Sequence, residues 1–165
     1  MAIYLDITGG EAVKGPVTTE GFKDQIQVGS FQFGAGRGIG SPKADALNRE
    51  ASAPSLSEIT LTKSWDPVSS AKLLQLAING TGKADAKLSF TTTGAKGEEA
   101  YLTIELTNVM VSGFSVTSGG DKPSESFSLN YVKITVTPWK IAAAGGDPKK
   151  GDVVSHDLST RKTNA

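Results

Sequence analysis

The amino-acid sequence predicts a mainly β protein with one flanking helix, and three observations support this fold class. Apolar and polar residues alternate along most apolar segments, which is the period of a strand with one buried face. The 165 residues include 19 glycines and 7 prolines, which favour turns, and 33 serines and threonines, which strands tolerate. A single segment repeats its apolar residues at helical spacing. At this length we expect one domain.

The first strand is expected near the N-terminus, where Ile3, Leu5 and Ile7 share one face and Tyr4 and Asp6 the other. The glycines of segment 94–97 predict a hairpin turn between two long strands. Further strands are expected over residues 59–65, 84–90, 114–117 and 153–158.

Three long apolar segments change the parity of their apolar residues partway along. Ile26 and Val28 have one parity, and Phe31 and Phe33 have the other. Either a β-bulge at residues 29–30 or a strand that changes its buried surface explains this. Long strands with a change of parity partway along are typical of strands that bend around a barrel or pass between two sheets. The same change separates Leu102, Ile104 and Leu106 from Val109 and Val111, and Phe127, Leu129 and Tyr131 from Ile134 and Val136.

A helix is predicted over about residues 66–79. Asp66 is a suitable N-cap, Pro67 is tolerated at the first position, and Gly80 provides a C-terminal stop. The apolar stripe is expected to dock on a sheet, so that Leu74→Ala would cost about 2–5 kcal/mol. A smaller cost would mean that the stripe is exposed and available for an interface. The residues expected to dock the helix are Trp65, Val68, Ala71, Leu74 and Ile78.

Composition excludes several classes of function. The chain has no cysteine and one histidine, which excludes disulfides, thiol nucleophiles, cysteine zinc sites and centres with two or three histidines. Seventeen basic and seventeen acidic residues leave no net charge to attract nucleic acid. No apolar run reaches the length of a membrane span, so membrane insertion is not expected. The N-terminus lacks the pattern of a cleaved signal peptide, so we expect a soluble cytoplasmic chain.

Candidate catalytic motifs fail on spacing. The glycine-rich segment 34–40 lacks the spacing of a dinucleotide or phosphate loop, so a mobile surface loop is the favoured interpretation. Ser155, His156 and Asp157 are adjacent, and adjacent strand residues point to opposite faces, so they form no catalytic relay. We therefore expect no enzyme, cofactor or metal site. The long strands instead present edges, which must be covered or used in assembly.

Two parts of the sequence resemble the Hcp family, the tube proteins of type VI secretion systems. The first is Leu61-Thr-Lys-Ser-Trp-Asp66, which leads into the predicted helix. The second is residues 101–112, followed after Gly119-Gly120 by residues 125–134 with their Leu-Asn-Tyr-x-Lys-Ile ending. With residues 2–6 and 31–34, the likeness covers about residues 1–140. It implies a two-sheet β-barrel domain over 1–140. After Trp139 the sequence departs from the family, and its small, flexible and polar residues predict a linker, a weak terminal strand and a frayed tail of the same domain over 141–165.

The resemblance also implies a function. Proteins of this family form six-membered rings that stack into a tube, which a contractile sheath drives out of the cell. The implied partners are other copies of the chain, the sheath, baseplate and spike protein, and effector toxins in the ring lumen. The chain would assemble in the cytoplasm and be secreted without a cleaved signal peptide. The alternative is a tail-tube protein of a phage or another contractile injection particle.

A long loop over about residues 36–54 lacks apolar periodicity, so its length requires another explanation than core stability. In tail-tube relatives the loop after the second strand projects toward the adjacent ring. We therefore predict that this loop contacts the next ring of a stack, and an idle mobile loop is the alternative. The charged residues assigned to this contact are Arg37, Lys43, Asp45, Arg49 and Glu50.

Overall fold

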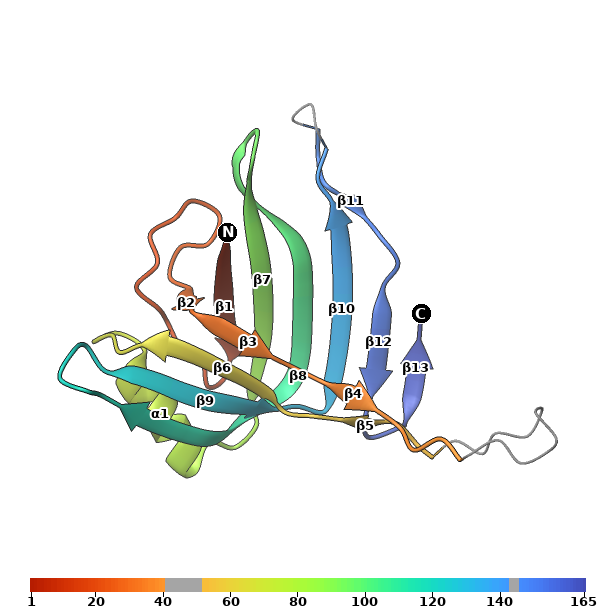
Figure 1. Cartoon of the computed structure of the whole chain (residues 1–165), viewed down its shortest axis with the longest axis horizontal. Coiled ribbons are helices and arrows are strands. Elements are labelled where there is room, and N and C mark those ends of the chain that lie inside the picture. The colour runs from red at the N-terminus through yellow and green to blue at the C-terminus, as the bar shows by residue number, and fades with distance from the viewer. Residues whose placement is uncertain (41–51, 143–145) are drawn as a thin grey trace.

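The computed structural model describes residues 1–40, 52–142 and 146–165 and is dominated by strands (Figure 1). One helix, α1 (Ser70–Asn79), lies among them. The strands are β1 (Ala2–Gly9), β2 (Ile26–Val28), β3 (Ser30–Gln32), β4 (Ala35–Gly36), β5 (Ser55–Leu56), β6 (Ile59–Ser64), β7 (Ala84–Gly94), β8 (Gly97–Thr117), β9 (Ser124–Asn130), β10 (Lys133–Lys140), β11 (Lys149–Lys150), β12 (Val154–Asp157) and β13 (Lys162–Asn164).

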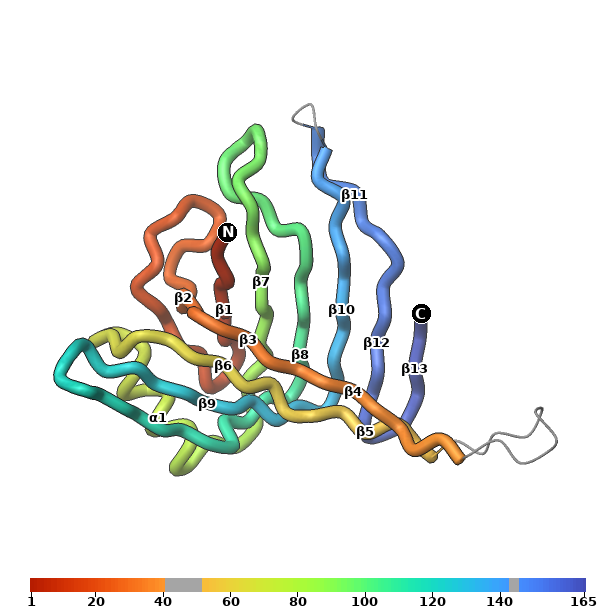
Figure 2. Tube along the Cα trace, viewed as in Figure 1, coloured from red at the N-terminus to blue at the C-terminus, as the bar shows by residue number. Residues whose placement is uncertain are grey.

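Apart from β4 and β5, which pair only with each other, the strands form two sheets that share the 21-residue strand β8. The larger sheet has the order β13-β12-β10-β8-β7-β1-β2, with β11 beside β10. The smaller sheet has the order β3-β6-β9-β8 and crosses in front of the larger one in Figure 2. The N-terminal part of β8 pairs with β7 and β10, and the part from Met110 onward pairs with β9.

The predicted parity changes are the points where the chain passes from one sheet to the other. Strand β2 pairs with β1, and after Gly29 the chain continues as β3, which pairs with β6. Strand β8 changes sheets near Asn108, whose φ is 53°. Strand β9 of the smaller sheet leads through residues 131–132 into β10 of the larger sheet. The predicted two-sheet architecture is confirmed, but the sheets do not close into a regular barrel, because β10, β12 and β13 extend the larger one beyond β8.

The main core lies between the two sheets. Leu5 and Leu88 of the larger sheet and Leu61 and Leu129 of the smaller one are fully buried in it. Tyr4, expected on the opposite face from Leu5, is also buried, because the segment after β1 folds over it. Its ring stacks on Phe22 with 4.7 Å between the centroids. Strand β1 is therefore covered on both faces.

The helix begins four residues later than predicted. Asp66 caps a turn instead of the helix, because its Oδ1 accepts the backbone N–H groups of Val68 and Ser69. Ser69 occupies the N-cap position, and the helix ends at Gly80 as predicted.

The predicted docking face of the helix is wrong. Leu73 and Leu76 face the core, whereas Leu74 is 40% exposed and Ile78 is 76% exposed. Of the other predicted docking residues, Val68 and Ala71 are exposed and Trp65 is half-buried. Because Ser70 is held against the sheets by polar contacts, the face of α1 that carries Ser70, Leu73 and Leu76 turns inward.

The C-terminal tail is ordered rather than frayed. Strand β12 lies within the strand predicted over 153–158. Strand β13 pairs with it from Ser155 opposite Asn164 to Asp157 opposite Lys162, so the expected fraying from residue 159 onward is wrong. Asp157 caps the turn between them by accepting the N–H groups of Ser159 and Thr160. The segment predicted as a linker contains β11, which pairs with the end of β10.

Leu73→Ala and Leu74→Ala provide a matched test of the helix orientation. Leu73 is fully buried, so its truncation should lower the free energy of unfolding by about 2–5 kcal/mol. Leu74 is exposed, so the same change there should cost less than about 1 kcal/mol. Urea unfolding of the two variants measures both values. A larger loss for Leu74→Ala than for Leu73→Ala would contradict this orientation.

Candidate assembly surfaces

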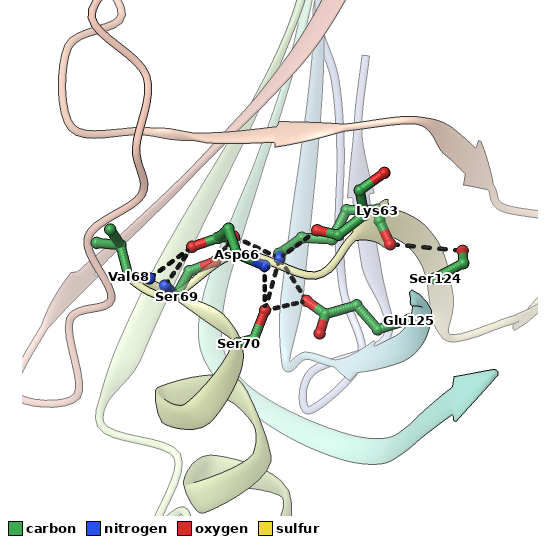
Figure 3. Close-up of polar contacts among 8 residues, drawn as sticks. Lys63, Asp66, Val68, Ser69, Ser70, Ser124 and Glu125 are labelled. Carbon is green, nitrogen blue, oxygen red and sulfur yellow. Dashed lines mark hydrogen bonds and ion pairs between the residues drawn. The ribbon is translucent and has the colours of Figure 1, made fainter. Parts of the chain in front are cut away.

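A buried ion-pair network joins β6, β9 and the start of α1 (Figure 3). Lys63 lies directly opposite Glu125 in the β6–β9 ladder, and the two side chains form an ion pair. The Lys63 Nζ also donates to Asp66 Oδ2 at 2.5 Å and to Ser70 Oγ at 3.0 Å. Ser70 Oγ donates in turn to Glu125 Oε1 and accepts the backbone N–H of Asp66. These contacts fasten the turn before α1 to the smaller sheet.

The electrostatics of this network follow from its burial. The side chains of Lys63 and Glu125 are 1% and 0% exposed, so neither charge could stay there without a partner. Burial alone would raise the pKa of Asp66, but hydrogen bonds from Lys63, Ser69 and Val68 outweigh it and lower that pKa to about 2. Asp66 is therefore ionised at neutral pH, and one ammonium group lies between two carboxylates.

The sequence analysis missed this network, although the sequence contains a pattern that predicts it. Lys63 continues the alternation of the buried residues Ile59 and Leu61, and Glu125 precedes Phe127 and Leu129 in the same way. A charged residue on the core face of each of two strands predicts a buried pair, because neither charge can be buried alone.

The long predicted loop leaves the body of the protein as a two-stranded ribbon formed by β4 and β5 (Figure 1). Backbone and serine contacts hold its two sides together: Ser57 N–H donates to Gly34 O at 2.8 Å, and Gly34 N–H donates to Ser57 Oγ at 2.9 Å. Gly38 and Ser52 repeat this arrangement farther out. Arg37 lies exposed on the ribbon. Lys43, Asp45, Arg49 and Glu50 lie outside the described residues.

The outer face of the smaller sheet carries uncharged side chains. Its residues pair across β3, β6, β9 and β8, and successive pairs lie on the same face. We call this surface the hydroxyl face. It consists of Ser30, Gln32, Thr60, Thr62, Ser64, Ser124, Ser126, Ser128, Gly113, Ser115 and Thr117.

The two motifs that the sequence analysis rejected as catalytic, His156 with its neighbours and segment 34–40, contribute to the fold. His156 is buried on β12, and its Nδ1 lies 2.8 Å from Thr163 Oγ1 of β13. Segment 34–40 enters the ribbon rather than a helix N-terminus.

Within the described ranges no group of three or more acidic or histidine side chains could hold a metal ion. No helix in the described part of the chain could span a membrane.

Asp66→Asn should make the free energy of unfolding depend less on pH in the acid range. Because the pKa of Asp66 is lower in the folded protein than its usual 3.8, the unfolded chain binds this proton more tightly. The ionised group therefore adds about 2 kcal/mol above about pH 4, and this contribution is lost as the pH falls to about 2. Urea unfolding at several pH values gives the slope of the unfolding free energy against pH. This slope should be smaller in Asp66→Asn than in the wild type. Asp147→Asn, which removes an exposed partner of Lys96, should keep the wild-type slope. Equal slopes for Asp66→Asn and the wild type would contradict this assignment.

The chain is similar to known proteins in sequence and in fold. A family model described as "Type VI secretion system effector, Hcp" matches residues 4–137. A solved type six secretion system protein is similar at 23% identity, with 99% of each chain covered and a TM-score of 0.85. Hcp1 from Salmonella typhimurium matches at 16% identity over 99% of this chain and 100% of its own, with a TM-score of 0.72.

An Hcp1 variant from the E. coli EAEC 042 pathovar also has a TM-score of 0.72, at 20% identity over 96% of this chain and 99% of its own. No curated protein matches the chain. These structures establish a shared fold along nearly the whole chain, and the family model covers most of the sequence. The chain belongs to the Hcp family, the tube proteins of type VI secretion systems.

Proposed function

We propose that this chain forms six-membered rings which stack into the exported tube of a type VI secretion system. The observation that carries the proposal is the family match over residues 4–137, on a fold shared with Hcp structures along nearly the entire chain. In this role the chain acts by assembly and not by catalysis. Its further partners would be the sheath, baseplate and spike protein, with effector toxins carried in the ring lumen.

The ribbon of β4 and β5 is proposed to contact the next ring of the stack. It leaves the body of the subunit, and its hydrogen-bonded base fixes the direction in which it leaves. Arg37 is exposed on it, and the residues beyond are proposed to add Lys43, Asp45, Arg49 and Glu50 to the same contact. Mixed charges at such a contact set orientation and make stacking sensitive to salt.

Export would follow assembly. A tube driven outward by the sheath carries its own subunits into the medium or into a target cell. We therefore propose that the chain assembles in the cytoplasm and leaves without a cleaved signal peptide.

Light scattering coupled to size exclusion tests the ring. The purified protein should have about six times the chain mass of 17.1 kDa, because a ring closes only at a fixed number of head-to-tail contacts. Negative-stain images of the same fraction should show rings with a central hole. A monomer whose mass does not change with concentration would overturn the proposal.

Replacement of residues 37–53 by a short Gly-Ser bridge tests the stacking contact. The variant should keep the ring mass, because the described residues that it removes (37–40, 52 and 53) are all exposed, but tubes and export should be lost. Arg37→Glu should weaken stacking by a smaller amount, most visibly at low salt. Sedimentation measures the tubes, and immunodetection in the medium measures export. Normal tubes and export from the bridged variant would show that the loop is idle.

A further inference from the structure

The C-terminal end of α1 carries the only Asn-Gly pair of the chain, Asn79-Gly80. An asparagine followed by glycine favours spontaneous deamidation, because glycine has no side chain to hinder attack by its own backbone nitrogen. Asn79 is exposed as the last residue of the helix, and Gly80 is the residue that ends it. The surface therefore presents a side-chain amide in the sequence context that favours its loss.

Deamidation at this pair needs no enzyme, oxidant or reductant. The Gly80 backbone nitrogen loses its proton and bonds to Asn79 Cγ, the Cγ–Nδ2 bond breaks, and ammonia leaves. Water then opens the cyclic imide at either of its two carbonyl groups, which gives aspartate or isoaspartate at position 79. Each product carries one more negative charge than the asparagine.

The folded end of the helix opposes this reaction. The Gly80 N–H donates to Leu76 O at 2.9 Å, so the proton that must leave is held in the last turn. The cyclic imide also requires the Gly80 nitrogen to swing toward the Asn79 side chain, which the helical backbone at Asn79 prevents. The reaction therefore proceeds only when the last turn of α1 opens.

The loop that follows the helix is fastened by Glu11, which comes soon after β1. Glu11 Oε1 accepts the Thr81 N–H at 2.8 Å and the Thr81 hydroxyl at 3.1 Å, and Glu11 Oε2 accepts the Lys83 N–H at 3.2 Å. The Gly10 N–H donates to Lys83 O at 2.9 Å beside them. The backbone N–H of Thr81 lowers the pKa of Glu11, so the carboxylate is ionised at neutral pH. Segment 80–83 cannot leave the end of α1 without breaking these bonds.

We propose that Asn79 is a deamidation site of this protein and that Glu11 sets its rate, because Glu11 holds segment 80–83 and keeps the last turn of α1 closed. All the groups involved belong to one copy of the chain, so this inference does not depend on the proposed ring. A carboxylate at position 79 would lie beside the free carbonyl groups of the last turn, at the negative end of the helix dipole. The product therefore opens this turn more readily than the original asparagine does.

Tryptic peptide mapping tests the proposal, because the peptide Leu73–Lys83 contains Asn79 as its only asparagine. The protein is incubated at mildly alkaline pH, either folded or unfolded in guanidinium chloride, and chromatography with mass spectrometry separates the aspartate and isoaspartate forms. Deamidation should be at least about tenfold slower in the folded protein than in the unfolded one. Glu11→Ala should accelerate it severalfold in the folded protein and leave the unfolded rate unchanged. Glu11→Gln, which keeps one acceptor oxygen, should give an intermediate rate.

The matched control is Glu20→Ala, which removes an exposed carboxylate from the same segment between β1 and β2 and should keep the wild-type rate. Asn79→Gln should abolish the products in both states. No products from the unfolded wild type would overturn the site itself. Equal rates in the folded and unfolded wild type would overturn the protection by the helix end. Equal folded rates in the wild type and both Glu11 variants would overturn the role of Glu11.

Discussion

A buried ammonium group must be neutralised, and Lys63 meets this requirement with carboxylates from two different parts of the fold. Glu125 belongs to the neighbouring strand, and Asp66 belongs to the turn that leads into α1. The register of β6 against β9, the path of that turn and the rotation of the helix therefore depend on one another. The same contacts link the two parts of the sequence that carry the family resemblance, one around Lys63 and the other around Glu125. Removal of one partner would leave a charge in the core that no rearrangement of apolar side chains could stabilise.

Much of the architecture could be predicted because sheets impose a two-residue period on the sequence. The parity changes at residues 26–33 and 102–111 indicated strands that pass between two surfaces, and the structure shows both. The same two-residue period does not predict that the two sheets stay open instead of closing into a barrel. The open shape depends on how far β10, β12 and β13 continue past β8, and neither the faint pattern of β12 nor the three residues of β13 indicates a partner.

The helix shows where periodicity alone gives the wrong answer. Its sequence contains two apolar stripes, one with Leu73 and Leu76 and another with Leu74 and Ile78, and hydrophobicity does not choose between them. The choice is made by Ser70, a small polar residue that reaches the buried pair of Lys63 and Glu125. Among the candidate assembly surfaces, the ribbon could be anticipated as a long segment without apolar periodicity. The hydroxyl face could not, since the sequence does not show which strands of the smaller sheet lie side by side.

The hydroxyl face has a consequence for whatever touches it. Serine and threonine side chains bind water on a flat sheet and present neither fixed charge nor a deep apolar pocket. A molecule of either net charge that touched this face would meet a hydrated surface that neither holds it by ion pairs nor repels it. Contacts of this kind are short-lived and insensitive to ionic strength. Such a surface tolerates contact with chemically different molecules but binds none of them tightly.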